Sequence, residues 1–241
     1  MKIQRKISLV AGVIALSFAG QGAFAACSNV TWQQLKDAAT FVKNNDGAFT
    51  NGLGNNMWVT MVDNTGLVCH VVNTAGQGQR SKETWGLSRV ISAQKANTSA
   101  GLSLDTPFQP WSSAMVYAAA QPGGFLYGVQ HSNPVDASRA YQGSPGVYGT
   151  VADPLKNKRI GGINVFGGGL PLYLNGAKIG AIGASGDTSC TDHAFAWRVR
   201  LRLATLGLVT STAGDEMNIT GGSHATCPLM PAGSPAQIGV K

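Results

Sequence analysis

The sequence predicts an α+β fold built on an antiparallel β-sheet. Two β-rich stretches are each interrupted by a turn signal, which is the pattern of a β-hairpin. Helix-compatible stretches precede, separate and follow these hairpins, and no internal repeat is visible in the 241 residues. The order of elements is therefore helix, hairpin, helices, loop, hairpin, helix, which is typical of the α+β class.

The first 25 residues have the pattern of a secretory signal peptide. Three basic residues within the first six precede an apolar run over 7–18, and Ala23-Phe24-Ala25 provides an A-x-A cleavage site. A membrane anchor would need about 20 apolar residues, more than this run contains. A lipoprotein site at Cys27 is the weaker alternative, because Phe24 fits that motif poorly. We expect cleavage after Ala25, a mature chain that starts at Ala26, and a periplasmic or secreted location.

The charge pattern favours neither a nucleic-acid partner nor a membrane-spanning mature chain. Loss of the first 25 residues removes three basic and no acidic residues, which lowers the formal net charge from +7 to +4. The remaining Lys and Arg are scattered, and the densest run (Lys156, Lys158, Arg159) is short. This distribution indicates a solvated basic surface rather than a nucleic-acid groove. No second long apolar segment follows, and the mature length suffices for one large domain with its own core.

The first elements expected are a helix and a hairpin. Thr31 and Gln34 have the spacing of a capping box, in which each side chain caps the backbone N–H of the other residue. One apolar helical face follows them, formed by Leu35, Ala38, Ala39 and Val42. Strands are expected over 57–63 and 67–73, because the turn-forming Asn64-Thr65-Gly66 separates these two β-rich runs.

The middle of the chain mixes helices with a long irregular stretch. An Ala-rich run over 87–104 predicts a helix, and a shorter helix is expected over 111–120. Residues 121–158 contain Gly, Pro, Asn and Ser throughout and show no clear element, which indicates either a functional loop or a poor assignment of elements here. A strand is expected over 160–166, and a helix over 191–206 follows the second hairpin.

The glycine-rich stretch 168–187, GGLPLYLNGAKIGAIGASGD, could be a phosphate loop, a catalytic serine turn or a hairpin. Its glycine spacing matches neither G-x-G-x-x-G nor the P-loop motif. The sequence around Ser185, Gly183-Ala184-Ser185-Gly186, is one residue shorter than the G-x-S-x-G nucleophile motif. Asn175-Gly176 is a preferred two-residue type I′ turn, because both of its positions require positive φ. The sequence therefore predicts a hairpin.

This hairpin register also predicts which side chains share a face. It pairs Leu174 with Ala177, Tyr173 with Lys178 and Leu172 with Ile179. One face then carries Leu172, Leu174, Ala177 and Ile179, whereas the other carries Tyr173, Lys178, Gly180, Ile182 and Ala184. Small residues in a strand permit a helix or a ligand to approach the backbone closely. Asp187 or Ser189 is expected to cap the following helix, whose N-terminus can receive an anion.

These motifs closely resemble the GlcG/HbpS-like haem-binding family. The matching residues are Gly168-Gly169-Leu170-Pro171, Asn175-Gly176, Gly180, Gly183, Ser185-Gly186 and Asp192, with Lys95-Ala96-Asn97-Thr98 and VTMVDNTGLVC upstream. The resemblance covers roughly 31–208. It implies a central antiparallel sheet with packed helices in a profilin-like layout, with a domain over 26–209 and a tail over 210–241. It also implies haem or a related tetrapyrrole as the ligand and a symmetric homo-oligomer as the assembly.

Four cysteines in an exported chain favour disulfides and permit three pairings. The resemblance to a secreted branch of the family implies a structural pair between Cys190 and Cys227. It thereby implies the pair Cys27–Cys69 as well. The tail over 210–241 would then be tied back to the start of the last helix.

The candidate haem-contacting residues have alternative roles that the sequence leaves open. His193 lies beside Asp192 at a helix start and is the main candidate for iron or another metal, although it could equally be a hydrogen-bonded structural histidine. His131 lies in the long loop and could be an ordinary surface histidine. The resemblance places Thr106 at the haem pocket, but a helix-ending turn explains it equally well. Lys95 could hold a haem propionate or be a solvated helix charge.

Three functions fit these observations. The leading hypothesis is an exported, non-enzymatic or accessory haem-binding protein that acts in haem sequestration or redox sensing, and no catalytic residue is assigned. The second is an enzyme on the same fold that handles a small anionic metabolite near Ser185 and Asp187. The third is a structural, oligomeric envelope protein.

Overall fold

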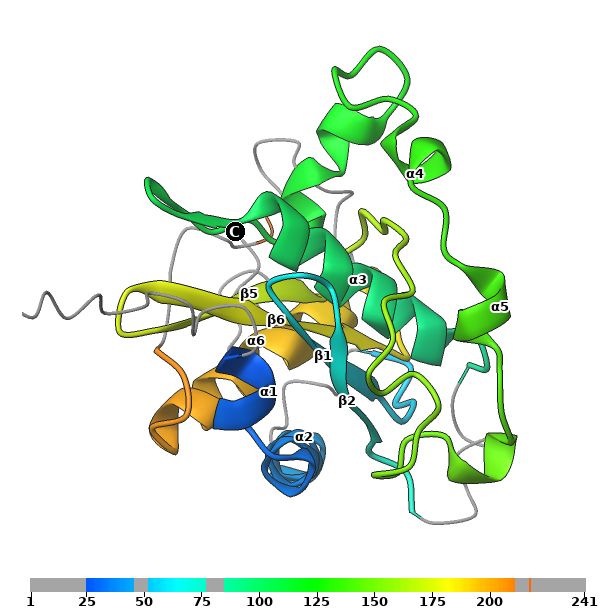
Figure 1. Ribbon diagram of the computed structural model, residues 1–241, viewed down its shortest axis with the longest axis vertical. Helices are drawn as coiled ribbons and strands as arrows, with labels where there is room; N and C mark the ends of the chain where they lie inside the picture. Colours follow the sequence, from blue (N-terminus) through cyan, green and yellow to red (C-terminus); the bar gives the residue numbers. More distant parts are fainter. Residues whose placement is uncertain (1–24, 46–51, 77–84, 211–216, 218–241) are drawn as a thin grey trace, which may run out of the picture.

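The structure is a computed structural model that describes residues 25–45, 52–76, 85–210 and 217. Its centre is a four-stranded antiparallel sheet in the order β2-β1-β6-β5 (Figure 1). The strands are β1 (Trp58–Asp63), β2 (Val68–Asn73), β5 (Gly169–Leu174) and β6 (Ala177–Ser185). Each predicted hairpin forms one half of the sheet, and β1 pairs with β6 between them. The predicted α+β class with a central antiparallel sheet is confirmed.

Helices cover both faces of this sheet. In Figure 1, α3 (Ser88–Leu102) lies on one face, and α1 (Ala25–Asn29), α2 (Trp32–Asn45) and α6 (Ser189–Thr205) lie on the other. The capping box at α2 is confirmed, since Thr31 N donates to Gln34 Oε1 at 2.8 Å and Gln34 N donates to Thr31 Oγ1 at 3.2 Å. The predicted apolar face of α2 is buried in the larger hydrophobic core.

The second hairpin contains a β-bulge that the sequence reading missed. Asn175 and Gly176 both have positive φ, 52° and 83°, as the predicted type I′ turn requires. Tyr173 pairs with Lys178 as expected, but Leu172 pairs with Gly180 rather than with Ile179. Ile179 is therefore an extra residue in β6.

The bulge reverses the predicted faces of the rest of β6. One inserted residue moves every later side chain to the opposite side of the sheet. Ile182 and Ala184 consequently pack in the core beneath α6, whereas Ala181 packs among the residues under α3. Gly183 also faces α3 and approaches it so closely that a Cβ atom there would collide with the helix backbone.

The region from 103 to 168 differs from the prediction in detail. The expected helix over 111–120 is two 3₁₀ helices, and the expected strand over 160–166 is absent. Gly161 and Gly162 have positive φ there, so the backbone forms an isolated bridge at Gly161 instead of a ladder. The short elements here are β3 (Leu104–Asp105), β4 (Phe108–Gln109), η2 (Ser113–Val116), η3 (Ala118–Ala120), α4 (Val129–Ser132), α5 (Ala137–Ala140) and η4 (Pro145–Val147).

A disulfide between Cys27 and Cys69 ties α1 to β2. Cys190 is disulfide-bonded as well. Cys227, its expected partner, lies outside the described residues, as do most of the proposed signal peptide and most of the tail. Within the described part of the chain, no helix has the length and apolarity needed to cross a lipid bilayer.

Candidate functional site

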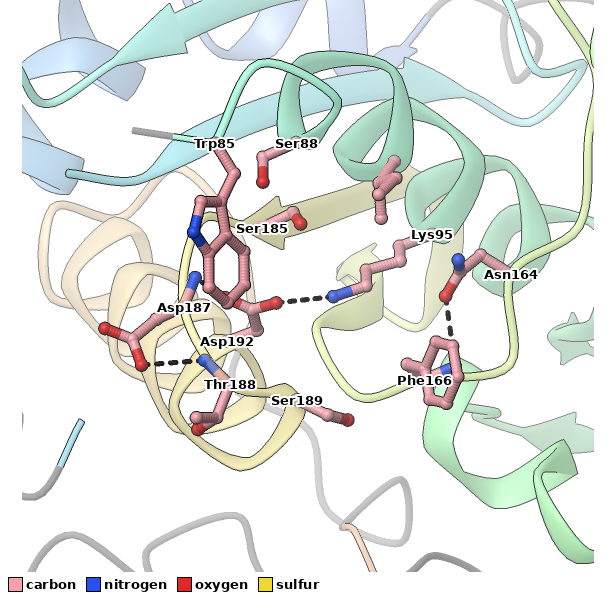
Figure 2. Close-up of a pocket in the computed structure, with 11 residues that line it drawn as sticks. Trp85, Ser88, Lys95, Asn164, Phe166, Ser185, Asp187, Thr188, Ser189 and Asp192 are labelled. Atoms are coloured by element: carbon pink, nitrogen blue, oxygen red, sulfur yellow. Dashed lines mark hydrogen bonds and ion pairs between the residues drawn. The ribbon is translucent and has the colours of Figure 1, made fainter. Parts of the chain in front are cut away.

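A pocket of about 350 Å³ opens between α3 and the start of α6, beside the end of β6. Figure 2 shows the side chains that line it. They are Trp85, Ser88, Ile91, Lys95, Asn164, Phe166, Ser185, Asp187, Thr188, Ser189 and Asp192. The pocket thus brings Lys95 and Asp192 together with Ser185 and Asp187, near which the sequence-based enzyme hypothesis placed a small anionic metabolite.

A buried ion pair forms the polar floor of the pocket. Lys95 Nζ lies 2.7 Å from Asp192 Oδ2, and both residues are only 2% exposed. Lys95 Nζ also donates to Ala184 O at 3.2 Å, and Asp192 Oδ1 accepts a bond of 2.9 Å from the backbone N–H of Asp187. Lys95 is therefore an internal partner of α6 and not the solvated helix charge that its sequence context also allowed.

The Asp192 carboxyl has an altered acidity. Burial raises its pKa to about 6, because the ionised form loses its hydration. The charge and hydrogen bond of Lys95 lower that pKa, but they do not offset the burial, and the nearby Asp187 raises it further. Asp192 can therefore gain or lose a proton close to neutral pH.

Two serine hydroxyls face the same pocket. Ser88 is the first residue of α3 and is 1% exposed, and its Oγ has no hydrogen-bond partner in the described structure. Ser185 ends β6 and is 3% exposed. Its hydroxyl makes no hydrogen bond to any described residue, so no histidine or carboxylate activates it as the serine of a catalytic triad would be activated.

Asp187 has a structural role beside the pocket. Its carboxylate accepts backbone N–H bonds from Leu53 at 2.9 Å, Asn55 at 3.3 Å and Thr188 at 2.7 Å. The N-cap of α6 is Thr188, whose side chain accepts from Thr191 N at 3.3 Å. The prediction of Asp187 or Ser189 as the cap is wrong, because the Asp187 oxygens are turned toward the segment after Gly52 instead.

Aromatic side chains form the rim of the pocket. Trp85 and Phe166 line it and are 50% and 44% exposed (Figure 2). The partly buried Ile91 lines the pocket as well. Sequence reasoning did not single out Trp85, Phe166 or Ser88. These three residues come together only because α3 packs against the segment before β5, and no local sequence pattern predicts that contact.

His193 does not line this pocket. It is fully buried in α6, where its Nδ1 accepts from Gly168 N at 3.4 Å and its ring lies 6.4 Å from that of Trp197. Within the described ranges, no three His, Cys, Asp or Glu side chains come together as a metal site would require.

The other two sequence-predicted residues lie on the surface outside the pocket. His131 is exposed on α4, and Thr106 is exposed in the turn between β3 and β4. Phe125 and Tyr127, which precede α4, are 84% and 66% exposed. The stretch 121–132 therefore presents two aromatic rings and a histidine to solvent.

The comparison with protein families identifies the family. Residues 34–199 match the model described as haem degrading protein HbpS-like. The chain belongs to the HbpS-like family. No curated protein matches it.

Solved structures of similar fold cover most of the HbpS-like chain. The Klebsiella pneumoniae protein ORFY is 21% identical with a TM-score of 0.45, and the match covers 84% of this chain and 98% of that one. A complex of PduOC with haem is 19% identical with a TM-score of 0.48, covering 75% and 94%. A double mutant of Streptomyces reticuli HbpS is 16% identical with a TM-score of 0.43, covering 83% and 99%.

The α3–α6 pocket is a poor site for ligated haem iron. Haem iron in proteins is usually held by His, Met, Tyr or Cys, and the residues that line this pocket include none of these types. The one amine in the lining, that of Lys95, is bound by Asp192. The pocket therefore suits a polar group, whereas the exposed stretch 121–132 offers the ligand types that iron needs.

Proposed function

We propose that this chain is an exported protein that binds haem or a related tetrapyrrole, with a role in sequestration or sensing. The observation that carries the proposal is the match of residues 34–199 to a haem-handling family. Export is supported by the signal-peptide pattern over 1–25 and by the disulfide Cys27–Cys69, since disulfides persist mainly in oxidising compartments.

The mature chain in this proposal has a domain over 26–209 and a tail over 210–241 that a Cys190–Cys227 disulfide ties back. It also forms a homo-oligomer, as the family resemblance implies. Light scattering on the purified mature protein measures that assembly, and mass spectrometry of the exported protein measures cleavage after Ala25.

The haem surface in this proposal is the stretch 121–132. Of the three histidines within the described residues, His131 is exposed, whereas His70 is 8% and His193 is 0% exposed. A macrocycle could pack against the rings of Phe125 and Tyr127, because aromatic side chains supply large flat contact areas. Either His131 or Tyr127 provides a side chain of the type that ligates iron.

A hemin titration followed at the Soret band tests this proposal. We expect the mature protein to give a saturable Soret shift, and His131→Ala to weaken binding about tenfold or more and to move the band, because one iron ligand is lost. The matched control is His193→Gln, which alters a buried histidine and should leave the band in place. Absence of any saturable shift in the wild type overturns haem binding. Loss of the band in His193→Gln or Thr106→Ala, with His131→Ala unchanged, overturns the assignment to 121–132.

A further inference from the structure

We propose that the α3–α6 pocket binds the carboxylate of a small acid that carries a flat apolar body, held by Lys95, Ser88 and Ser185. The pocket is formed without the stretch 121–132 that is proposed as the haem surface, since no residue of that stretch lines it.

Three polar positions in the pocket are unused. An ammonium group has three N–H donors, and Lys95 Nζ donates to Asp192 and to Ala184 O, which leaves the third without a partner among the described residues. Ser88 Oγ is buried and has no partner among the described residues. Ser185 is 3% exposed, and its Oγ makes no hydrogen bond to a described residue. Leaving a buried hydroxyl unpaired is costly. A ligand with two acceptor oxygens would satisfy these donors together.

The residues at the mouth of the pocket indicate that the rest of the ligand is flat and apolar. Trp85 and Phe166 are about half exposed at its rim, with Ile91 beside them. Contact between these apolar side chains and a flat hydrocarbon would favour binding, and aromatic rings prefer stacked or edge-to-face contact. A cavity of about 350 Å³ lies at the small end of the range for small-molecule sites. The occupant is therefore an aromatic carboxylate or a similar group.

Proton uptake by Asp192 accompanies binding of the carboxylate. The charged groups that face Asp192 are Lys95 on α3 and Asp187 just before α6. While Asp192 is ionised, it neutralises Lys95 and repels an incoming anion. Its pKa is about 6, so acidification through that value frees Lys95 for the ligand. The affinity for a carboxylate should therefore rise as the pH falls.

Isothermal titration calorimetry with benzoate tests the inference on the full mature chain. We expect benzoate to bind more tightly at about pH 5.5 than at about pH 8, by roughly tenfold or more, because Asp192 is protonated only at the lower pH. Benzamide has nearly the same shape without the charge, so it should bind at least about tenfold more weakly. Absence of benzoate binding at the lower pH, or equal binding of benzamide, overturns the inference.

Variants locate the site. Ser88→Ala should weaken benzoate binding by about tenfold, the usual effect of losing a hydrogen bond to a charged group. Ser138→Ala is the matched control, since Ser138 is exposed on α5 and does not line the pocket. Asp192→Asn imitates the protonated carboxyl, so it should remove the pH dependence and bind benzoate tightly at pH 8. Ser88→Ala with wild-type affinity overturns the inference even if Asp192→Asn does not fold.

The carboxylate could belong to a free acid or to a haem propionate, and competition distinguishes these sources. Displacement of benzoate by hemin but not by hemin dimethyl ester identifies a propionate as the occupant. Retention of benzoate in the presence of hemin identifies a free acid. The benzoate measurements require no haem, so failure of haem binding and failure of this inference are observed separately.

Discussion

At the residue scale, α3 places two cations in the protein interior. Arg89 pairs with Asp153, 64 residues away, and Lys95 pairs with Asp192, 97 residues away. A helix sequence shows that such residues exist but not that they are buried, because their partners are distant in the chain. Buried charges must be paired and hydrogen-bonded to be tolerated. These pairs therefore fix how α3 sits on the sheet.

The Arg89–Asp153 pair gives a stability prediction. Arg89 Nε and Nη2 contact the two oxygens of Asp153 at 3.0 and 2.5 Å, and the guanidinium lies 3.7 Å from the ring centroid of Tyr148. Arg89→Met leaves a buried carboxylate without its partner, so we expect the free energy of unfolding to fall by about 3–5 kcal/mol. Arg89→Lys should restore only part of this loss, because an ammonium cannot form the two-pronged contact. Urea unfolding followed by circular dichroism measures both.

The control for this prediction is an ion pair on the surface. Arg139 Nε lies 3.0 Å from Asp136 Oδ2, with side chains that are 53% and 42% exposed. Arg139→Met should change stability by less than about 1 kcal/mol, because solvent screens exposed pairs. Equal effects of Arg89→Met and Arg139→Met would show that the buried pair does not support the fold.

At the element scale, local signals were enough to predict the two hairpins and the three long helices α2, α3 and α6, but not how these elements contact one another. The Thr31–Gln34 capping box and the Asn175-Gly176 turn are encoded within a few residues, and both are confirmed. The pattern of apolar and polar residues in the sequence does not reveal the bulge at Ile179. This bulge alone places the later side chains of β6 on the face opposite to the predicted one. The strand-like composition over 160–166 also gave a wrong prediction of a strand, because two glycines with positive φ prevent a β-ladder there.

In the candidate site, too, the sequence predicted the residues that belong to motifs but not the residues that only tertiary packing brings together. Family motifs pointed to Lys95 and Asp192, which do meet in the pocket. The rim residues Trp85 and Phe166 carry no motif, and their proximity depends on how α3 and the segment before β5 pack. Burial of His193 likewise results from the contact of α6 with the backbone at Gly168, which the sequence around His193 does not reveal.

The close contact between β6 and α3 predicts a strong requirement for glycine at one position. A Cβ at Gly183 would collide with Ser92 O and Ala96 N, which are backbone atoms and cannot rotate away. Gly183→Ala must push α3 from the sheet, so we expect a loss of about 1–3 kcal/mol in the free energy of unfolding, as for an overpacked core. The lining of the α3–α6 pocket should shift with the helix. Chemical denaturation measures the loss.

Gly101→Ala is the matched control within α3. A Cβ at Gly101 meets no atom within 4 Å, and Ala has a higher helix propensity than Gly. This variant should be neutral or more stable by up to about 1 kcal/mol. If Gly183→Ala is as well tolerated as Gly101→Ala, then close packing does not explain the glycine in β6.

At the scale of the whole molecule, the N-terminal helix is joined to the fold by a covalent link and by core packing. Ala26 in the short α1 and Val30 just after it are buried in the core beneath the sheet, and the carbonyl of Val30 lies 2.8 Å from His70 Nε2 on β2. A five-residue helix has little stability of its own. The disulfide Cys27–Cys69 therefore holds α1 against β2, which is an edge strand of the sheet.

The Cys27–Cys69 disulfide should supply a large part of the stability of the mature protein. It spans a sequence separation of 42 residues, for which loop-closure entropy predicts a contribution of about 4 kcal/mol. Cys27→Ser/Cys69→Ser should lower the free energy of unfolding by about 2–4 kcal/mol while Cys190 stays oxidised, and urea unfolding under non-reducing conditions measures this. Because the link acts on the unfolded chain, the sheet and the α3–α6 pocket should persist in the variant, with near-native circular dichroism and benzoate affinity at low pH. A variant as stable as the wild type would instead mean that packing of Ala26 and Val30 alone holds α1 in place.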